Sequence, residues 1–117
     1  MSTGTFIHLH VHSEYSLLDG ACKISDLVDK AIQLKMSALA LTDHGNMFGA
    51  VEFYEAAKSR GIKPILGYEA YVAQGNRLDK ESKNGKETIS HITLLAENNE
   101  GYRNLLKLTT SAYLEGF

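Results

Sequence analysis

Apolar and polar residues alternate strictly near the start of the chain. Ile7, Leu9 and Val11 are apolar, and histidine occupies positions 8, 10 and 12. Successive side chains of a strand point to opposite faces, so this pattern predicts a strand over 6–12 with its histidines on one face. Alternate residues of a strand are roughly 6.6 Å apart, which allows two imidazoles to reach one metal ion. A half-buried strand whose polar face merely happens to be histidine is the simpler alternative.

Segments with a helical period and short apolar runs follow one another along the rest of the chain. The predicted helices cover about 25–35, 48–60 and 98–113, and the further predicted strands cover 38–42, 64–72 and 91–96. Ser25 is the expected N-cap of the first helix, and Gly61 is expected to end the second. The run 38–42 is apolar enough for a strand buried on both faces.

The order of these elements favours an α/β fold with parallel strands. About four strands of the parallel type alternate with covering helices, which predicts right-handed crossovers between them. Residues 13–23 are expected to form a loop. The polar stretch 74–90 is also expected to be an exposed loop, with Asn84-Gly85 as a candidate hairpin turn.

Side chains able to bind metal gather near the ends of the predicted strands. They are His10, His12, Asp19, Asp43, His44, Glu69 and His91. Ligands of parallel α/β folds bind at the carboxyl ends of the strands, where most of these residues fall. His91 is the exception, because it opens the fourth predicted strand.

Each of these residues also has an ordinary structural interpretation. His44 could cap a helix or bond to a carbonyl group, Asp43 could be an N-cap, and His91 could be a satisfied histidine. Glu69 is harder to explain in this way, because a buried carboxylate without a partner is costly. Taken together, a set of His, Asp and Glu without cysteine suits Zn, Mn or Fe and hydrolysis by metal-bound hydroxide.

Composition narrows the class of protein. The 117 residues are 44% hydrophobic and 22% charged, which suits one small globular domain. The net charge of −2 gives no basic face, so a role with nucleic acid would be local, metal-mediated or exercised within a larger assembly. The sequence shows no apolar run long enough for a membrane span and no secretion signal. Its single cysteine, Cys22, fits a reducing cytoplasm.

Four stretches resemble the polymerase-and-histidinol-phosphatase (PHP) domain family. They read H-L-H-V-H-S-E-Y-S-L-L-D-G, A-L-A-L-T-D-H-G-N-M-F-G-A-V-E-F-Y, G-I-K-P-I-L-G-Y-E-A-Y-V and H-I-T-L-L-A-E-N-N-E-G-Y-R-N-L. The first stretch is typical of the whole family. The other three resemble the PHP region at the N-terminus of bacterial DNA polymerase III alpha subunits.

This resemblance implies a fold and a metal site. The family fold is a distorted (β/α)7 barrel whose strand ends hold up to three metal ions. Carried over to this sequence, the family ligands are His10, His12, Asp19, His44, Glu69 and His91, with Glu69 as a bridging carboxylate. His8 falls one step too early in the motif to be a ligand.

The resemblance also implies that residues 1–117 are the N-terminal portion of a PHP domain. The family has further strands and three further ligands downstream, and a polymerase subunit carries its polymerase domains beyond them. We therefore expect a fragment of a longer DNA-directed DNA polymerase, with no polymerase activity and little phosphoesterase activity of its own.

Three functions remain open on the sequence alone. The chain could contribute a metal site for 3′–5′ exonuclease or phosphoesterase chemistry in a replicative polymerase that binds DNA and other replicase subunits. It could instead be a structural and docking module with a vestigial metal site. A stand-alone PHP phosphatase is the third, and the polymerase-like stretches speak against it. Because a partial barrel exposes strand edges, we also expect the chain to self-associate.

Overall fold

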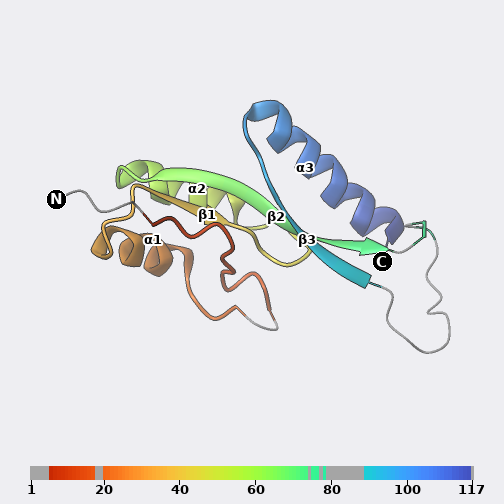
Figure 1. Ribbon diagram of the computed structural model, residues 1–117, viewed down its shortest axis with the longest axis horizontal. Coiled ribbons are helices and arrows are strands. Elements are labelled where there is room, and N and C mark those ends of the chain that lie inside the picture. The colour runs from red at the N-terminus through yellow and green to blue at the C-terminus, as the bar shows by residue number, and fades with distance from the viewer. Residues whose placement is uncertain (1–5, 18–19, 74, 77, 79–88, 117) are drawn as a thin grey trace.

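The computed structural model describes residues 6–17, 20–73, 75–76, 78 and 89–116, which form one α/β unit (Figure 1). Its elements in chain order are α1 (Ile24–Gln33), β1 (Ala38–Leu41), α2 (Ala50–Ser59), β2 (Lys63–Ala73), β3 (Ile89–Leu95), α3 (Asn99–Ser111) and the short π-helical turn η2 (Ala112–Gly116). The three predicted helices are present. The expected α/β class is therefore confirmed.

Within the described residues the sheet has three strands in the order β1-β2-β3. β1 and β2 are parallel, as predicted, with Leu41 opposite Leu66. β2 and β3 are antiparallel, with Tyr71 opposite His91. The prediction of about four parallel strands is therefore wrong in both number and direction. The candidate turn Asn84-Gly85 lies in the connection between β2 and β3, outside the described residues.

Residues 6–12 run beside β1 but do not form the predicted regular strand. The amide of Ala40 donates to the carbonyl of His8 (3.0 Å), and the amide of Thr42 donates to the carbonyl of Val11 (2.8 Å). The first segment therefore advances three residues while β1 advances two, which breaks the strand ladder as a bulge does. The Val11 amide donates to Oγ1 of Thr42 (2.9 Å) rather than to a backbone carbonyl.

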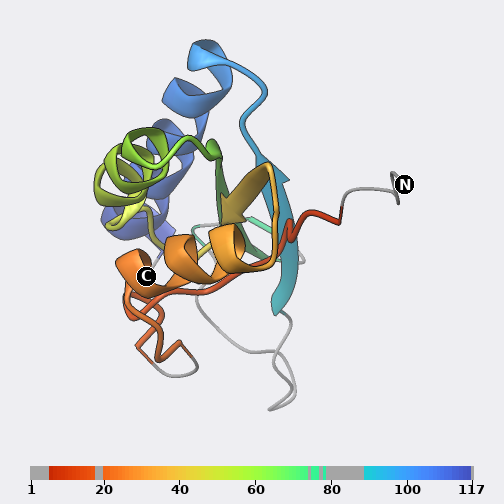
Figure 2. The ribbon, with the colours of Figure 1, turned by 90° about the vertical axis from the view of Figure 1, so that its left-hand side faces the viewer.

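The hydrophobic core lies between the sheet and the first two helices. Ile24 and Val28 of α1 and Phe53 of α2 are fully buried and pack with Leu39 and Leu41. All four residues of β1 are buried, which confirms the prediction of a strand covered on both faces. The view in Figure 2 shows the helices gathered on one side of the sheet, and residues 8–11, which carry the N-terminal histidines, run along the edge of β1.

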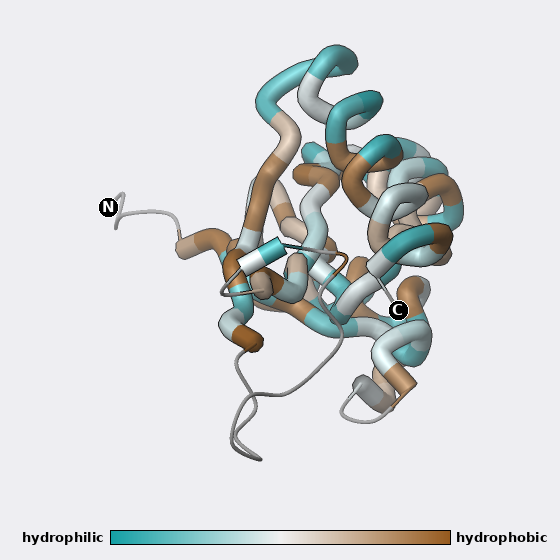
Figure 3. The backbone as a smooth tube through the Cα atoms, turned by 90° about the vertical axis from the view of Figure 1, so that its right-hand side faces the viewer, coloured by the Kyte–Doolittle hydropathy of each residue, from teal (hydrophilic) through white to brown (hydrophobic). Residues whose placement is uncertain are grey.

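Helix α3 crosses the sheet at its β2–β3 end (Figure 1). Hydrophobic and hydrophilic bands alternate along its backbone in Figure 3, as expected of a helix with one apolar side. Leu105 is its buried residue, whereas Leu106 and Leu108 remain exposed. Its N-cap is Asn98, whose side chain accepts a hydrogen bond from the Gly101 amide (3.0 Å), so the predicted start near residue 98 is confirmed.

The other helix ends differ slightly from the predictions. The N-cap of α1 is Lys23, two residues before the predicted N-cap Ser25, which is therefore wrong. The helix begins at Ile24, and this start places Ile24 in the core. α2 ends as predicted before Gly61, which has a positive φ of 75°. Within the described residues, no helix has both the length and the apolar character that a membrane crossing requires.

Candidate metal centre

Glu69 occupies the middle of the site, on the face of β2 opposite α2. Its amide donates to the carbonyl of Asp43, and its carbonyl accepts from the amide of Gly45, each at 3.0 Å. These bonds continue the parallel pairing beyond the end of β1 and place His44 directly opposite Glu69. Glu69 is only 5% exposed, so its carboxylate requires polar partners within the protein.

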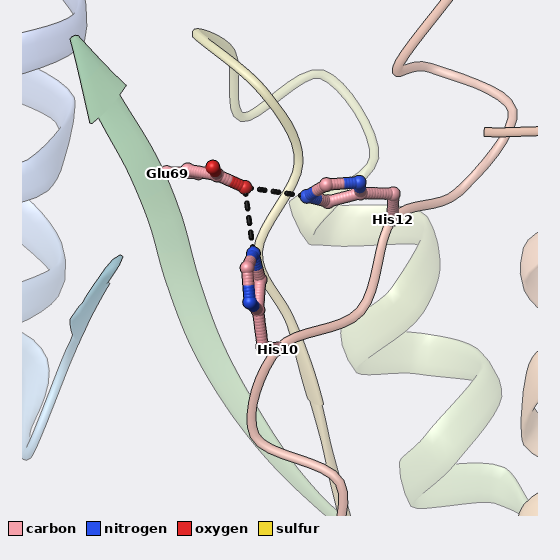
Figure 4. A group of neighbouring side chains, drawn as sticks. All are labelled: His10, His12 and Glu69. Carbon is pink, nitrogen blue, oxygen red and sulfur yellow. Dashed lines mark hydrogen bonds and ion pairs between the residues drawn. The ribbon is translucent and has the colours of Figure 1, made fainter. Parts of the chain in front are cut away.

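Two histidines of the N-terminal segment meet one oxygen of this carboxylate (Figure 4). Nε2 of His10 lies 2.7 Å from Oε2 of Glu69, and Nε2 of His12 lies 2.5 Å from the same oxygen. Both rings donate hydrogen bonds to the carboxylate. The irregular backbone of residues 6–12 thus still turns both histidines toward Glu69, whereas His8, which the strand pattern placed on the same face, is outside both ligand groups.

Two further histidines face the same carboxylate at longer range. Nδ1 of His44 lies 3.5 Å from Oε2 of Glu69, and Nδ1 of His91 lies 3.6 Å from Oε1. The described residues thus hold two groups of three possible ligands that share Glu69, one with His10 and His12 and the other with His44 and His91. Within each group the candidate ligand atoms all lie within 4.8 Å of one another.

The direction of β3 explains why His91 belongs to the site. The beginning of an antiparallel strand lies at the same edge of a sheet as the ends of its parallel neighbours. His91 stands opposite Tyr71, two residues beyond Glu69 on β2. The apparent exception in the sequence pattern therefore arises from the wrong assumption that all strands are parallel.

Charge and burial act against each other on the Glu69 carboxylate. Burial is the largest influence and raises its pKa, whereas hydrogen bonds from His10 and His12 and the nearby charge of His44 lower it. The net result is a pKa below the ordinary value, so the carboxylate stays ionised. An anionic carboxylate surrounded by imidazoles is a donor set that suits Zn, Mn or Fe.

Asp43 has a different role from its neighbour His44. It is buried, and its two oxygens accept hydrogen bonds from Ser13 Oγ (2.7 Å), the Ser13 amide (2.6 Å) and Ser16 Oγ (2.8 Å). The His44 amide in turn donates to Ser16 Oγ (3.0 Å). The alternative of Asp43 as an N-cap is wrong, because α2 begins only at Ala50 and Asp43 instead ties the loop after His12 to the end of β1.

Asn46 completes the same turn. Its side-chain amide donates to the carbonyls of Tyr15 and His44, each at 3.0 Å, and its oxygen accepts from the Phe48 amide (3.1 Å). Sequence reasoning did not assign roles to Ser16 or Asn46. The usable signal was the buried position of Asp43 after an apolar strand, because such a carboxylate requires several hydrogen-bond donors.

Two other sequence predictions concern His8 and Asp19. His8 is exposed, and its ring packs edge-on against Phe6 with centroids 4.7 Å apart, outside both ligand groups. Asp19 lies outside the described residues. The structure therefore brings His10, His12, His44, Glu69 and His91 together, and their role as metal ligands stays a prediction.

Comparison with known proteins places this arrangement in a family. The model of the PHP domain matches residues 8–117, which include every candidate ligand. The chain belongs to the PHP domain family. The resemblance found in the sequence is therefore confirmed.

The most similar curated relatives of this PHP domain include DNA polymerase III alpha subunits. The subunit of Borreliella burgdorferi is 59% identical over 112 residues, which cover 96% of this chain and 10% of the relative. The subunit of Aquifex aeolicus is 48% identical over 117 residues, with coverage of 96% and 10%. The chain thus spans about a tenth of the length of these relatives.

Solved structures share the fold. An amidohydrolase from Chromobacterium violaceum, with bound sulfate and no metal, superposes with a TM-score of 0.60 at 29% identity, over 90% of this chain and 34% of that one. A candidate metal-dependent phosphoesterase from Bifidobacterium adolescentis gives a TM-score of 0.53 at 22% identity, over 86% and 31%. The second likeness shows the fold alone.

Proposed function

We propose that this PHP domain holds divalent metal ions that support phosphoester hydrolysis in a DNA polymerase III alpha subunit. The observation that carries the proposal is the convergence of four histidine nitrogens on the buried carboxylate of Glu69. These histidines come from three separate parts of the chain, and a hydrophobic core alone has no need of such a polar cluster. The polymerase relatives and the phosphoesterase-like fold support the same reading.

The residues present fit a site with two neighbouring ions. His10 and His12 would hold one ion, His44 and His91 the other, and Glu69 would bridge them. Asp19 is proposed as a further ligand. A complete domain of this family would hold up to three ions. Bound Zn, Mn or Fe would supply hydroxide near neutral pH and polarise a phosphoryl oxygen.

The chain's own residues give this site its form. Glu69 offers one oxygen to His10 and His12 and turns the other toward His91. His10 and His91 are about half exposed, whereas His12 and His44 lie deeper, so a phosphoester can approach from the side of His10 and His91. The most specific form of the proposal is a 3′–5′ exonuclease acting on DNA.

The polymerase context extends the proposal beyond this chain. We propose that residues 1–117 form the N-terminal part of a (β/α)7 PHP barrel in a cytoplasmic replicative polymerase. Its partners would be DNA and the other replicase subunits. Two observations support this view: the high identity to polymerase subunits, and the position of all described helices on one side of the sheet (Figure 2).

A structural and docking role is the second candidate. It is favoured by the hydrogen bonds of His10 and His12 to Glu69, because these bonds give the buried carboxylate polar partners within the protein. Such a cluster can link the N-terminal segment to β2 without catalysis. A stand-alone phosphatase is less well supported, because the polymerase relatives match nearly the whole chain.

The test is a nuclease assay on a polymerase subunit that carries this PHP domain, supplied with Mn²⁺ or Zn²⁺ and a 3′-labelled DNA strand. Glu69→Gln removes the bridging charge and should lower nucleotide release by at least about 100-fold, because metal ligation is lost. Polymerase activity should remain. Glu55→Gln, an exposed change on α2, is the matched control.

Each result selects one of the two functions. Loss of nucleotide release in Glu69→Gln but not in Glu55→Gln supports the hydrolytic site. Absence of metal-dependent nucleotide release from the unchanged subunit would favour the structural role. We expect the 117-residue chain alone to release little product, since it spans only about a tenth of the length of its polymerase relatives.

A further inference from the structure

Tyr71 occupies the wall of the site beside the second pair of histidines. It lies two residues after Glu69 on β2, so both side chains project from the same face of the strand. It also stands directly opposite His91 in the β2–β3 register. Tyr71 thus borders the group formed by His44, Glu69 and His91.

The ring of Tyr71 contacts both histidines of this group. It stacks nearly parallel to His44, with an interplanar angle of 7° and centroids 6.2 Å apart. It meets the ring of His91 edge-on, with centroids 4.9 Å apart. Both separations fall in the range at which aromatic rings attract one another.

The turn after His44 is shaped to admit this ring. Gly45 has a positive φ of 64°, and a Cβ atom at this position would lie only 2.6 Å from Cε2 of Tyr71. Glycine therefore meets two demands there, the left-handed backbone and the close approach of the ring. The backbone next to His44 and the Tyr71 ring consequently fix each other.

The two ligand groups differ in how their histidines are oriented. His10 and His12 are hydrogen-bonded to Glu69 at 2.7 and 2.5 Å, whereas His44 and His91 lie 3.5 and 3.6 Å from it. The second pair therefore depends more on contacts other than the carboxylate. The ring contacts with Tyr71 are shared by both members of that pair.

We propose that Tyr71 is a positioning residue for the second metal ion, because its ring sets the orientation of His44 and His91. This inference rests on the proposed function, since it assumes that the site takes two ions. Residues that orient metal ligands typically change metal affinity by about 10–100-fold when removed. Loss of the ring should therefore weaken one ion position and spare the other.

The experiment is a Mn²⁺ titration of the 117-residue chain, followed by elemental analysis and electron paramagnetic resonance. The unchanged chain should bind two ions and give the spectrum of a coupled pair. Tyr71→Ala should raise the Kd of the second ion by about 10–100-fold and leave that of the first within about twofold. The coupled spectrum should then disappear at Mn²⁺ concentrations that saturate the unchanged chain.

Three variants make the result specific. Tyr71→Phe keeps the ring and should restore both ions. Val72→Ala removes a similarly exposed side chain from the opposite face of the same strand and should have no effect. His44→Ala removes a proposed ligand and should reproduce the loss of the second ion. Circular dichroism confirms that each variant is folded.

The outcomes separate this inference from the proposed function. Two tightly bound ions in both the unchanged chain and Tyr71→Ala would overturn the role of Tyr71 and leave the metal site intact. Equal loss of both ions in Tyr71→Ala would also overturn it, as a general structural effect. No bound ion in the unchanged chain would overturn the two-ion site itself, and the role of Tyr71 with it.

Discussion

At the scale of single residues, one carboxylate organises four imidazoles. The Glu69 side chain is 6% exposed, and its hydrogen bonds to His10 and His12 keep its pKa low although burial acts to raise it. The rings of His12 and His44 lie 4.0 Å apart between centroids, so the two ligand groups also touch directly.

The first prediction compares histidines from one short stretch. The double variant His10→Ala, His12→Ala should lose most of the bound metal, because it removes two of three ligands of the first group. His8→Ala is the matched control, since His8 lies in the same segment but contacts Phe6 instead. Elemental analysis after dialysis gives the metal content. Unchanged metal in the double variant, or equal loss in the control, contradicts the assignment.

A second prediction concerns Asp43, which supports the site without being in either group. Asp43→Ala leaves two hydroxyl groups and one amide of Ser13 and Ser16 without their buried acceptor. The free energy of unfolding should fall by about 3 kcal/mol. Urea denaturation measures this change.

Asp29→Ala serves as the control for Asp43. Asp29 is mostly exposed and pairs with Arg60 at 3.1 Å on the surface. Because exposed ion pairs contribute little, its removal should change the free energy of unfolding by no more than about 0.5 kcal/mol. Equal destabilisation by the two variants would show that the buried hydrogen bonds of Asp43 contribute no more to the free energy of unfolding than an exposed ion pair does.

The residues that meet at the site could be predicted from the sequence, but the structural roles of their neighbours Asp43 and Tyr71 could not. His10, His12, His44 and Glu69 were predicted because polar side chains at strand ends stand out against apolar strands, and His91, which opens its predicted strand, was added by the resemblance to the family pattern. The role of Asp43 depends on hydroxyl groups some thirty residues away, and the contact of Tyr71 with His44 depends on the strand register. Neither contact can be predicted from the local sequence pattern, because both join residues that are far apart in the chain.

At the scale of elements, helices were easier to predict than strands. The period of α1 and α2 reflects burial against one neighbouring surface, which local sequence encodes directly. β3 was expected to be parallel, but it is antiparallel to β2. The direction of a strand depends on its connection and on its pairing with a neighbouring strand, which local sequence does not encode. Residues 6–12 alternate like a strand, yet the extra residue between the bonds at His8 and Val11 breaks the ladder with β1.

The ends of α1 and α2 share one geometry and lead to a third prediction. After α1 the amides of Lys35 and Met36 donate to the carbonyls of Ile32 and Ala31. After α2 the amides of Gly61 and Ile62 donate in the same way to the carbonyls of Lys58 and Ala57. This is the Schellman arrangement, which needs a left-handed residue where α1 has Lys35 with a φ of 60°. Lys35→Gly should therefore stabilise the fold by about 1 kcal/mol, measured as the free energy of unfolding.

Gly61→Ala is the reverse experiment. A Cβ at this position would meet nothing within 4 Å, so any loss of stability must come from the backbone conformation. The variant should lose about 1 kcal/mol. The account of both helix ends fails if Lys35→Gly destabilises the fold or if Gly61→Ala leaves it unchanged.

At the scale of the whole molecule, the described chain is elongated. Its extents are 54 × 27 × 24 Å and its radius of gyration is 15.8 Å, against about 13 Å for a compact domain of this length. Within the part that the structure describes, β3 has β2 as its only strand neighbour. Ile89, Ile92 and Leu95 on this edge strand are all more than 40% exposed.

These features lead to a fourth prediction, that the 117-residue chain self-associates. Exposed edge strands with apolar side chains pair readily with another chain. Sedimentation at low micromolar concentration should show a dimer or larger species, and Ile92→Lys should shift it toward monomer by placing a charge on the edge strand. Ile32→Lys, at a similarly exposed position on α1, should not. A compact monomer of the unchanged chain contradicts the prediction.

The two-ion site is tested most directly by anomalous diffraction from crystals of the chain soaked with Mn²⁺ or Zn²⁺. The account predicts two anomalous peaks beside Glu69, one next to His10 and His12 and the other next to His44 and His91. The carboxylate of Glu69 should contact both ions. Peaks away from Glu69, or no peak at saturating metal, would contradict the account.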